Sequence, residues 1–325
     1  MTLRYRHYSP ELDPDACISV DGNAPGRLNL SHWPGNRTPS RFKHDLSTGA
    51  CLKLLQEKDR DVLRGFTTVT NNHWDTDGCC SAFALIQPGV ALVQGHHLIA
   101  AALAGDFELF TTPEGVKIDL TLTALTQHPA SSVHSDRFTD ERARRQAQYD
   151  HGLALLPSLL ANPDLHADWF AREYWTIQRD LRALREDLHH VERFDALDLS
   201  VVRADQPLHR TAVNTAAGTD RVLTLTSHPQ GGVTAELRLT TLSWFELVAQ
   251  PKRTRVDWSP LLSRLTEEFA AAGGHWQADD LADPTPRLAF VGDSGDLAPH
   301  PAGADRLQAA VARFFASHPL RPAGI

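Results

Sequence analysis

Three side chains that can bind a metal ion stand at alternate positions near residue 75. His73, Asp75 and Asp77 directly follow the β-branched run 66–70, which predicts a strand. Because alternate residues of an extended chain project to the same side, the imidazole and the two carboxylates are expected to converge. An oxygen-rich set of this kind suits Mn²⁺ or Mg²⁺ before Zn²⁺. The alternative is local: Asp77 caps the helix predicted over 79–86, and Asp75 forms an Asx turn.

The same string resembles the first motif of the DHH phosphoesterase family. That family includes single-strand exonucleases, nanoRNA and cyclic-dinucleotide phosphodiesterases, and inorganic pyrophosphatases. The resemblance is carried by His73, Asp75, Asp77, Gly78 and Ser81. It implies that the histidine and the two aspartates bind catalytic Mn²⁺. It also implies that the glycine and the small serine let the helix pack closely behind them.

The Asp-His-His motif that names this family is missing from its usual place after the first motif. One interpretation is a circular permutation, in which Asp21, after the predicted strand 17–20, replaces that motif together with His32. The other is a degenerate motif at 95–97, which has two histidines but no carboxylate. A bridging metal ligand needs a carboxylate, and this favours Asp21. Asp106 could supply the carboxylate of the family's second motif, and its alternative is an ordinary turn residue.

A second resemblance lies in the C-terminal half, to the small domain that accompanies DHH catalytic domains. There an arginine-bearing strand, a helix and a Gly-Gly-Gly-His loop clamp the substrate. Glycine lets backbone N–H groups approach a phosphate, and arginine presents a planar fork to its oxygens. Ala272 replaces one glycine of that run. The alternatives are a helix C-cap for the glycines and a solvated strand face for the arginines. The residues that carry the predicted substrate contacts are Arg253, Arg255, Gly273, Gly274 and His275.

A third candidate segment is the loop 32–39, which is rich in polar and rigid residues. Loops of this kind positioned by a sheet often carry binding sites. Asn36 and Arg37 are therefore predicted to bind an anionic group of the substrate. The alternative is a tight loop with Trp33 packed on the core.

Alternating strands and helices predict an α/β fold with a largely parallel sheet in the first part of the chain. Three domains or segments are expected: a DHH-like metal-binding domain over 1–137, a helical connector over 138–195 and a smaller α/β substrate-binding domain over 196–325. Strands are predicted at 17–20, 66–70, 90–93, 199–203, 222–227, 234–240, 244–249 and 287–291. Helices are predicted at 45–57, 79–86, 97–104, 140–160, 166–188, 260–271 and 304–315.

The composition argues against a protein that binds long nucleic acids and against a membrane protein. The chain has 325 residues, 42% of them hydrophobic, and a net charge of −8. This length can bury a large core, and the acidic balance argues against binding a long nucleic acid. No apolar run approaches the ~20 residues of a membrane span, so no membrane partner is expected. The four cysteines form no Cys-x-x-Cys pair, which predicts reduced thiols and a cytoplasmic protein.

Together these features predict a Mn²⁺-dependent (or Mg²⁺-dependent) hydrolase of a small phosphate ester or short nucleotide. The expected partner is this small anionic substrate, and the sequence leaves a homodimer open. A metal-dependent hydrolase of a non-phosphate bond, or a non-catalytic binding protein on the same fold, are the alternatives. The predicted catalytic residues are Asp77, His73 and His32. The predicted metal ligands are His73, Asp75, Asp77, Asp21 and Asp106.

Overall fold

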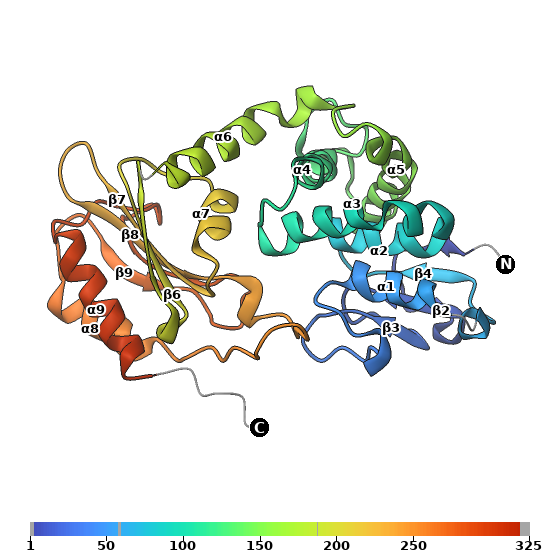
Figure 1. Cartoon of the computed structure of the whole chain (residues 1–325), viewed down its shortest axis with the longest axis horizontal. Coiled ribbons are helices and arrows are strands. Elements are labelled where there is room, and N and C mark those ends of the chain that lie inside the picture. Colours follow the sequence, from blue (N-terminus) through green and yellow to red (C-terminus); the bar gives the residue numbers. More distant parts are fainter. Residues whose placement is uncertain (1–2, 58–59, 187, 319–325) are drawn as a thin grey trace. The chain divides into compact units, whose positions relative to one another are not determined.

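The computed structural model describes residues 3–57, 60–186 and 188–318, which divide into two compact units (Figure 1). Unit 1 is Met1–Trp175 with Phe245–Gln250, and unit 2 is Thr176–Trp244 with Pro251–Ile325. The predicted α/β fold class is confirmed, with a parallel sheet in the first unit and a mixed sheet in the second. The boundary falls inside helix α6 (Ala167–Arg185). The expected connector is therefore divided between the two units.

Unit 1 is built on a four-stranded parallel sheet with the order β1-β4-β2-β3. Its central strand β2 is buried along its whole length, as expected of a parallel strand covered on both faces. The carboxyl ends of neighbouring parallel strands meet at one edge, so the residues that follow β2, β3 and β4 are brought together there. The strands are β1 (Arg4–Tyr5), β2 (Cys17–Val20), β3 (Leu28–Leu30) and β4 (Thr68–Thr70).

Five helices complete unit 1: α1 (Ser47–Gln56), α2 (Thr76–Ile86), α3 (Pro88–Phe107), α4 (Pro113–Gln127) and α5 (Glu141–Ala161). The predicted strand at 90–93 is wrong, because these residues are the first turns of α3. A short apolar run does not distinguish strand from helix, and Pro88 at the first helical position favours the helix. The histidine pair at 95–97 therefore lies inside a helix rather than at a strand end.

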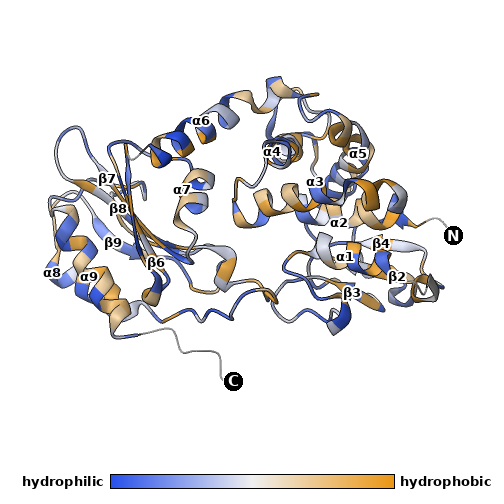
Figure 2. Ribbon diagram, in the orientation of Figure 1, coloured by the Kyte–Doolittle hydropathy of each residue, from blue (hydrophilic) through white to orange (hydrophobic). Residues whose placement is uncertain are grey.

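Helix α3 is the only described helix long and apolar enough to cross a membrane, judged by length and composition alone. In the fold it packs against α1, α2 and α4. Figure 2 shows hydrophobic residues along α2 and α3. Helix α3 thus contributes residues to the core of unit 1.

Unit 2 is a six-stranded mixed sheet with the order β5-β6-β7-β8-β10-β9. Strands β6 and β7 are parallel and are joined through α7, and the other pairs are antiparallel. The strands are β5 (His190–Phe194), β6 (Leu199–Ala204), β7 (Arg221–Ser227), β8 (Val233–Leu239), β9 (His275–Ala278) and β10 (Arg287–Val291). The helices wholly within this unit are α7 (Arg210–Ala217), α8 (Ser259–Glu268) and α9 (Ala304–Ala316).

One face of this sheet is covered by α8 and α9 (Figure 1). Leu223 and Leu225 of β7 belong to the core on that side, and Thr224 between them points to the other face. Gly231 and Gly232, both with positive φ, form the turn between β7 and β8.

The predicted strand at 244–249 is wrong. Its backbone donors bind isolated acceptors of unit 1 rather than a neighbouring strand. The Glu246 amide donates to the His32 carbonyl at 2.7 Å, and the Val248 and Ala249 amides donate to Asp45 Oδ1 at 2.6 and 2.9 Å. The hydrogen bonds of this segment hold His32 and Asp45, the two ends of the loop 32–45, in place.

Candidate metal centre

Six residues of unit 1 that the sequence singled out converge beyond the carboxyl edge of the parallel sheet. Their candidate ligand atoms form two sets, and within each set all of these atoms lie within 4.8 Å of one another. The first set is Asp21, His32, Asp77 and Asp106, and the second is Asp21, His73 and Asp75. Asp21 belongs to both sets, so its two carboxylate oxygens can face two ions.

Asp21 is held at the end of β2 in a backbone conformation that fits few side chains. Its φ is 43° and that of Gly22 is 114°, the left-handed region that costs a non-glycine residue about 1–3 kcal/mol. A Cβ at Gly22 would lie 3.3 Å from the His73 ring, so glycine lets that imidazole approach. Asp21 Oδ1 accepts hydrogen bonds from Trp33 Nε1 at 3.0 Å and Ser47 Oγ at 2.8 Å. Its other oxygen, Oδ2, lies 3.0 Å from His73 Nε2.

His32 is fully buried, and its ring orientation is fixed from behind. The Nδ1–H donates to the backbone carbonyl of Asp45 at 2.6 Å, which leaves Nε2 as the lone-pair nitrogen of the neutral ring. Nε2 lies 3.1 Å from Asp106 Oδ2, 3.4 Å from Asp21 Oδ1 and 3.6 Å from Asp77 Oδ2. Within the described residues this buried nitrogen makes no hydrogen bond of acceptable geometry. Metal-binding histidines are typically held by a carbonyl in this way.

Asp77 is oriented by the amino terminus of α1. Its two oxygens accept hydrogen bonds from the backbone N–H groups of Ser47 at 2.7 Å and Thr48 at 2.8 Å. Helix α1 has no side-chain cap of its own, and its N-cap residue is Leu46. The buried carboxylate therefore satisfies the orphan donors of the helix, and the positive end of the helix dipole stabilises the carboxylate.

Asp75 combines the two roles that the sequence offered as alternatives. Its Oδ1 caps α2 by accepting from the Gly78 amide at 2.8 Å, so Asp75 rather than Asp77 is the N-cap. Its Oδ2 lies 2.7 Å from His73 Nε2. The His73 Nδ1–H faces Asn72 Oδ1 at 3.1 Å, so Nε2 of the neutral ring carries a lone pair toward two carboxylates.

Burial and mutual repulsion perturb these groups. Burial, and then the charge of Asp77, raise the pKa of Asp106 well above its ordinary value. Burial and the nearby Asp21 likewise raise the pKa of Asp77. Burial alone would lower the pKa of His32, but the carboxylates of Asp106 and Asp21 outweigh it and raise that pKa. These are the shifts expected where several carboxylates share a buried space with an imidazole.

The donor set fits divalent cations that accept both oxygen and imidazole ligands. Among described residues the two sets hold carboxylates and imidazoles and no thiolate. Carboxylate-rich coordination suits Mn²⁺ and Mg²⁺, and imidazole broadens the choice toward first-row transition metals. The buried Nε2 of His32, aimed at three carboxylates, is the observation that a cation would explain best.

One protein family model covers nearly the whole chain. It matches residues 1–316 and is described as a family of unknown function, DUF6687. The chain belongs to DUF6687. No curated protein matches it. The geometry of the centre therefore carries the functional argument for this DUF6687 member.

The loop residues Asn36 and Arg37 lie close to the centre in sequence but have other contacts. The Asn36 amide donates to the Trp33 carbonyl and to Glu246 Oε2, both at 2.9 Å. Asn36 thus fixes the loop, as the tight-loop alternative describes. Arg37 is exposed and donates its backbone N–H to Asn29 Oδ1 at 2.9 Å. No described contact commits the Arg37 guanidinium, and its predicted anion contact stays a prediction.

The predicted substrate residues of the second half all belong to unit 2. Arg253 Nε donates to Asp198 Oδ2 at 2.8 Å. The Arg255 guanidinium donates to Ser243 Oγ at 3.0 Å and to backbone carbonyls within the loop 281–284. Arg255 therefore stabilises a loop of its own unit, and we do not include it in the proposed site.

The glycines and His275 follow α8 rather than end it. Helix α8 ends at Glu268, so Gly273, with φ 87°, lies in the turn that leads into β9. A Cβ at Gly274 would lie 2.5 Å from the Val291 carbonyl oxygen, which explains that glycine by close packing. His275 is the exposed first residue of β9.

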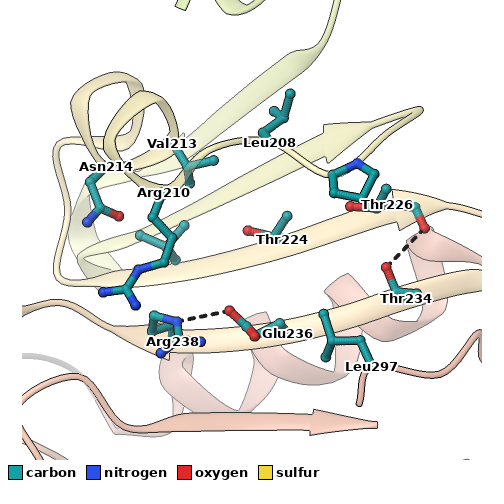
Figure 3. Close-up of a pocket in the computed structure, with 12 residues that line it drawn as sticks. Leu208, Arg210, Val213, Asn214, Thr224, Thr226, Thr234, Glu236, Arg238 and Leu297 are labelled. Atoms are coloured by element: carbon teal, nitrogen blue, oxygen red, sulfur yellow. Dashed lines mark hydrogen bonds and ion pairs between the residues drawn. The ribbon is translucent and has the colours of Figure 1, made fainter. Parts of the chain in front are cut away.

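Unit 2 contains a pocket of its own on the sheet face opposite α8 and α9 (Figure 3). Threonines of β7 and β8 form its floor, and the ion pair of Arg238 with Glu236, at 2.9 Å, lies along one side. Its volume of about 130 Å³ is below the ~300–1,000 Å³ usual for small-molecule sites. None of the five predicted substrate residues of this unit lines it.

Sequence reasoning missed the residues that orient the ligands. Ser47 and Thr48 were predicted to start a helix, and they do, but their N–H groups bind Asp77. Packing of Trp33 on the core was the alternative interpretation of its loop, and neither interpretation included the bond from its indole N–H to Asp21. Helix α1 has no side-chain cap. Only the fold shows that Asp77 lies close enough to accept hydrogen bonds from its first N–H groups.

Proposed function

We propose that this DUF6687 member is a divalent-cation-dependent hydrolase of a small phosphate ester, acting through a two-ion centre. The observation that carries the proposal is the pair of ligand sets that share the buried Asp21. A bridging carboxylate between two ion sites is the usual arrangement of two-metal phosphoesterases. The resemblance of the string His73–Ser81 to the first DHH motif supports phosphorus as the target.

The protein residues have defined tasks in this proposal. Asp21, His32, Asp77 and Asp106 would hold one cation, and Asp21, His73 and Asp75 the other. Bound cations would supply Lewis-acid activation of a water nucleophile and stabilisation of charge on phosphoryl oxygens.

The chain supplies preorganisation. When the His32 ring is neutral, its proton lies on Nδ1, which donates to the Asp45 carbonyl, so Nε2 has a lone pair for a cation. The amino terminus of α1 fixes the orientation of the Asp77 carboxylate. Fixed outer partners of this kind reduce the reorganisation needed when ligands bind.

Metal binding is the first test. Elemental analysis and titration calorimetry with Mn²⁺ should find close to two ions per chain, and Asp21→Asn should lose both because it removes the shared ligand. The exposed Asp136→Asn is a matched control in the same unit and should bind as the wild type does. Absence of any bound divalent ion in the wild type would refute the proposal.

Substrate class is the second test. The Mn²⁺-loaded protein should hydrolyse bis(p-nitrophenyl) phosphate or p-nitrophenyl phosphate and leave p-nitrophenyl acetate at its background rate. Hydrolysis of the acetate alone would favour a non-phosphate hydrolase. Two bound ions with no turnover of any ester would favour a binding protein on the same fold.

The proposal also includes a cytoplasmic location. Cys17, Cys51, Cys79 and Cys80 are all free and buried, which suits a reducing compartment.

A further inference from the structure

A polar pocket in unit 1 adjoins the candidate metal centre. Its volume is about 300 Å³, and Asp75, a ligand of the second set, forms part of its wall. Gly105, next to ligand Asp106, forms another part, and a Cβ there would lie 3.0 Å from Asp119 Oδ1. The pocket and the metal centre thus share the residue Asp75.

Helix α4 contributes a polar stripe to this pocket. Asp119, Thr123, Thr126 and Gln127 all line it, and their spacing of four, three and one residues places them on one helical face. This stripe of one carboxyl, two hydroxyl and one amide group offers hydrogen bonds to a ligand.

Another part of the pocket wall carries two cations from the first turns of α5. The Arg144 and Arg145 side chains are 25% and 24% exposed. Both donate to a single carboxylate, that of Glu141, at 3.0 and 3.4 Å. Because that carboxylate is itself 71% exposed, these pairs are weak and easily exchanged. One acid between two guanidinium groups leaves a positive excess on this wall.

Arg144 also has an unsatisfied donor. Its Nε is buried and makes no hydrogen bond to any described residue. A buried N–H without an acceptor costs free energy, so the hydrogen-bonding capacity of this guanidinium is incompletely used. Its accessible N–H groups can bind a phosphate or carboxylate oxygen that enters the pocket. Guanidinium groups bind such oxygens with short, charge-assisted hydrogen bonds.

We infer that this pocket binds a second anionic group of the substrate, with Arg144 and Arg145 as its binding residues. The substrate class is then a small phosphate ester carrying a further phosphate or carboxylate, rather than a simple phosphomonoester. This inference rests on the proposed function, since the first phosphoryl group lies at the cation centre.

A matched pair of non-hydrolysable probes tests the second anion. Titration calorimetry on the Mn²⁺-loaded full chain compares propane-1,3-bisphosphonate with propylphosphonate, which has the same carbon chain and one anion fewer. The wild type should bind the bisphosphonate at least about tenfold more tightly, the effect of one charge-assisted hydrogen bond. A third probe, 3-phosphonopropionate, distinguishes a carboxylate-binding pocket from one that requires phosphate.

Substitutions of Arg144 and Arg145 test whether this pocket binds the second anion. Arg144→Gln and Arg145→Gln should each reduce the preference for the bisphosphonate severalfold, and the double variant should abolish it, while propylphosphonate affinity is unchanged. Arg142→Gln is the control, because this arginine of the same helix pairs with the exposed Glu11 and does not line the pocket. If the Gln variants do not fold, Arg144→Lys and Arg145→Lys should give an intermediate preference, since charge remains but the fork is lost.

The outcomes separate this inference from the proposed function. No preference in the wild type, or a preference that survives in the double variant, overturns the inference while Mn²⁺ binding and ester hydrolysis stand. Loss of Mn²⁺ binding in the wild type overturns the proposed function itself.

Discussion

Buried acids in the two units have different neighbours. In unit 2, Asp198 accepts from Arg253 Nε at 2.8 Å and from the Asp220 amide at 3.2 Å. Asp220 accepts from Thr240 Oγ1 and the Ser243 amide, both at 3.0 Å. In unit 1, Asp21 and Asp77 also accept hydrogen bonds, but one ligand atom from each of Asp21, His32, Asp77 and Asp106 lies within 4.8 Å of the others.

The difference shows what a buried carboxylate requires. An ionised carboxylate inside a protein must be paired or fully hydrogen-bonded. In unit 2 the positive charge beside Asp198 belongs to a side chain of the protein, Arg253. Unit 1 provides oriented ligands whose charges repel, and a bound divalent ion would remove that repulsion. Each prediction below tests this contrast.

The largest effect is expected on turnover. Asp77→Asn should lower kcat for a phosphodiester by roughly 10²–10⁴-fold, because it removes a ligand charge that acts in the transition state. Asp198→Asn in unit 2 should change kcat by less than about threefold, since that acid serves the fold. Steady-state kinetics with saturating Mn²⁺ measures both. Equal losses in the two variants would contradict the contrast.

The second prediction concerns the sign of a stability change. In EDTA at pH 8, Asp198→Asn should lower the melting temperature, with a loss of about 1–3 kcal/mol, because it leaves Arg253 without its acid. Asp106→Asn should raise it, because it relieves repulsion with Asp77. Calorimetric melting of metal-free protein gives both values. Added Mn²⁺ should reverse the order for Asp106→Asn, since only the wild type gains from binding.

A third prediction separates packing from ligand geometry. A Cβ at Gly78 would overlap Tyr149 Oη and lie 3.0 Å from Asp75 Oδ1, and one at Gly274 would meet the Val291 carbonyl. Gly78→Ala and Gly274→Ala should each cost about 1–3 kcal/mol by overpacking. Only Gly78→Ala should also weaken Mn²⁺ binding, measured by calorimetry, because it displaces Asp75. Unchanged Mn²⁺ affinity in Gly78→Ala would show that Asp75 is not a ligand.

The smallest expected effect depends on pH. Burial raises the pKa of Asp119 to about 7. Between about pH 4 and 7 the folded protein therefore holds a proton that the unfolded chain releases, and stability falls as the pH rises. Asp119→Asn should remove this slope and be more stable than the wild type at pH 8, with no difference near pH 4. Melting curves across this range test it, with Asp136→Asn as an exposed control.

Local pattern was sufficient for the strand-end residues. Alternation after a β-branched run predicted that His73, Asp75 and Asp77 project to one side, and His73 and Asp75 do share a ligand set with Asp21. For Asp77 the prediction is wrong, because this residue already lies in α2, where the extended chain has ended, and it belongs to the other set. The choice of Asp21 over the histidine pair at 95–97 followed from the need for a carboxylate, and the structure places Asp21 within both ligand sets. These predictions rested on the twofold period of an extended chain, which acts over a few residues.

Only the tertiary structure decided the rest. The run 90–93 is helical because the residues after it continue α3. Arg255 donates to carbonyls of the loop 281–284, which lies far along the chain. Asp77 received its partners from Ser47 and Thr48, thirty and twenty-nine positions away. Parallel strands bring such distant segments to one edge, and a polar group then binds whatever partner burial leaves within reach.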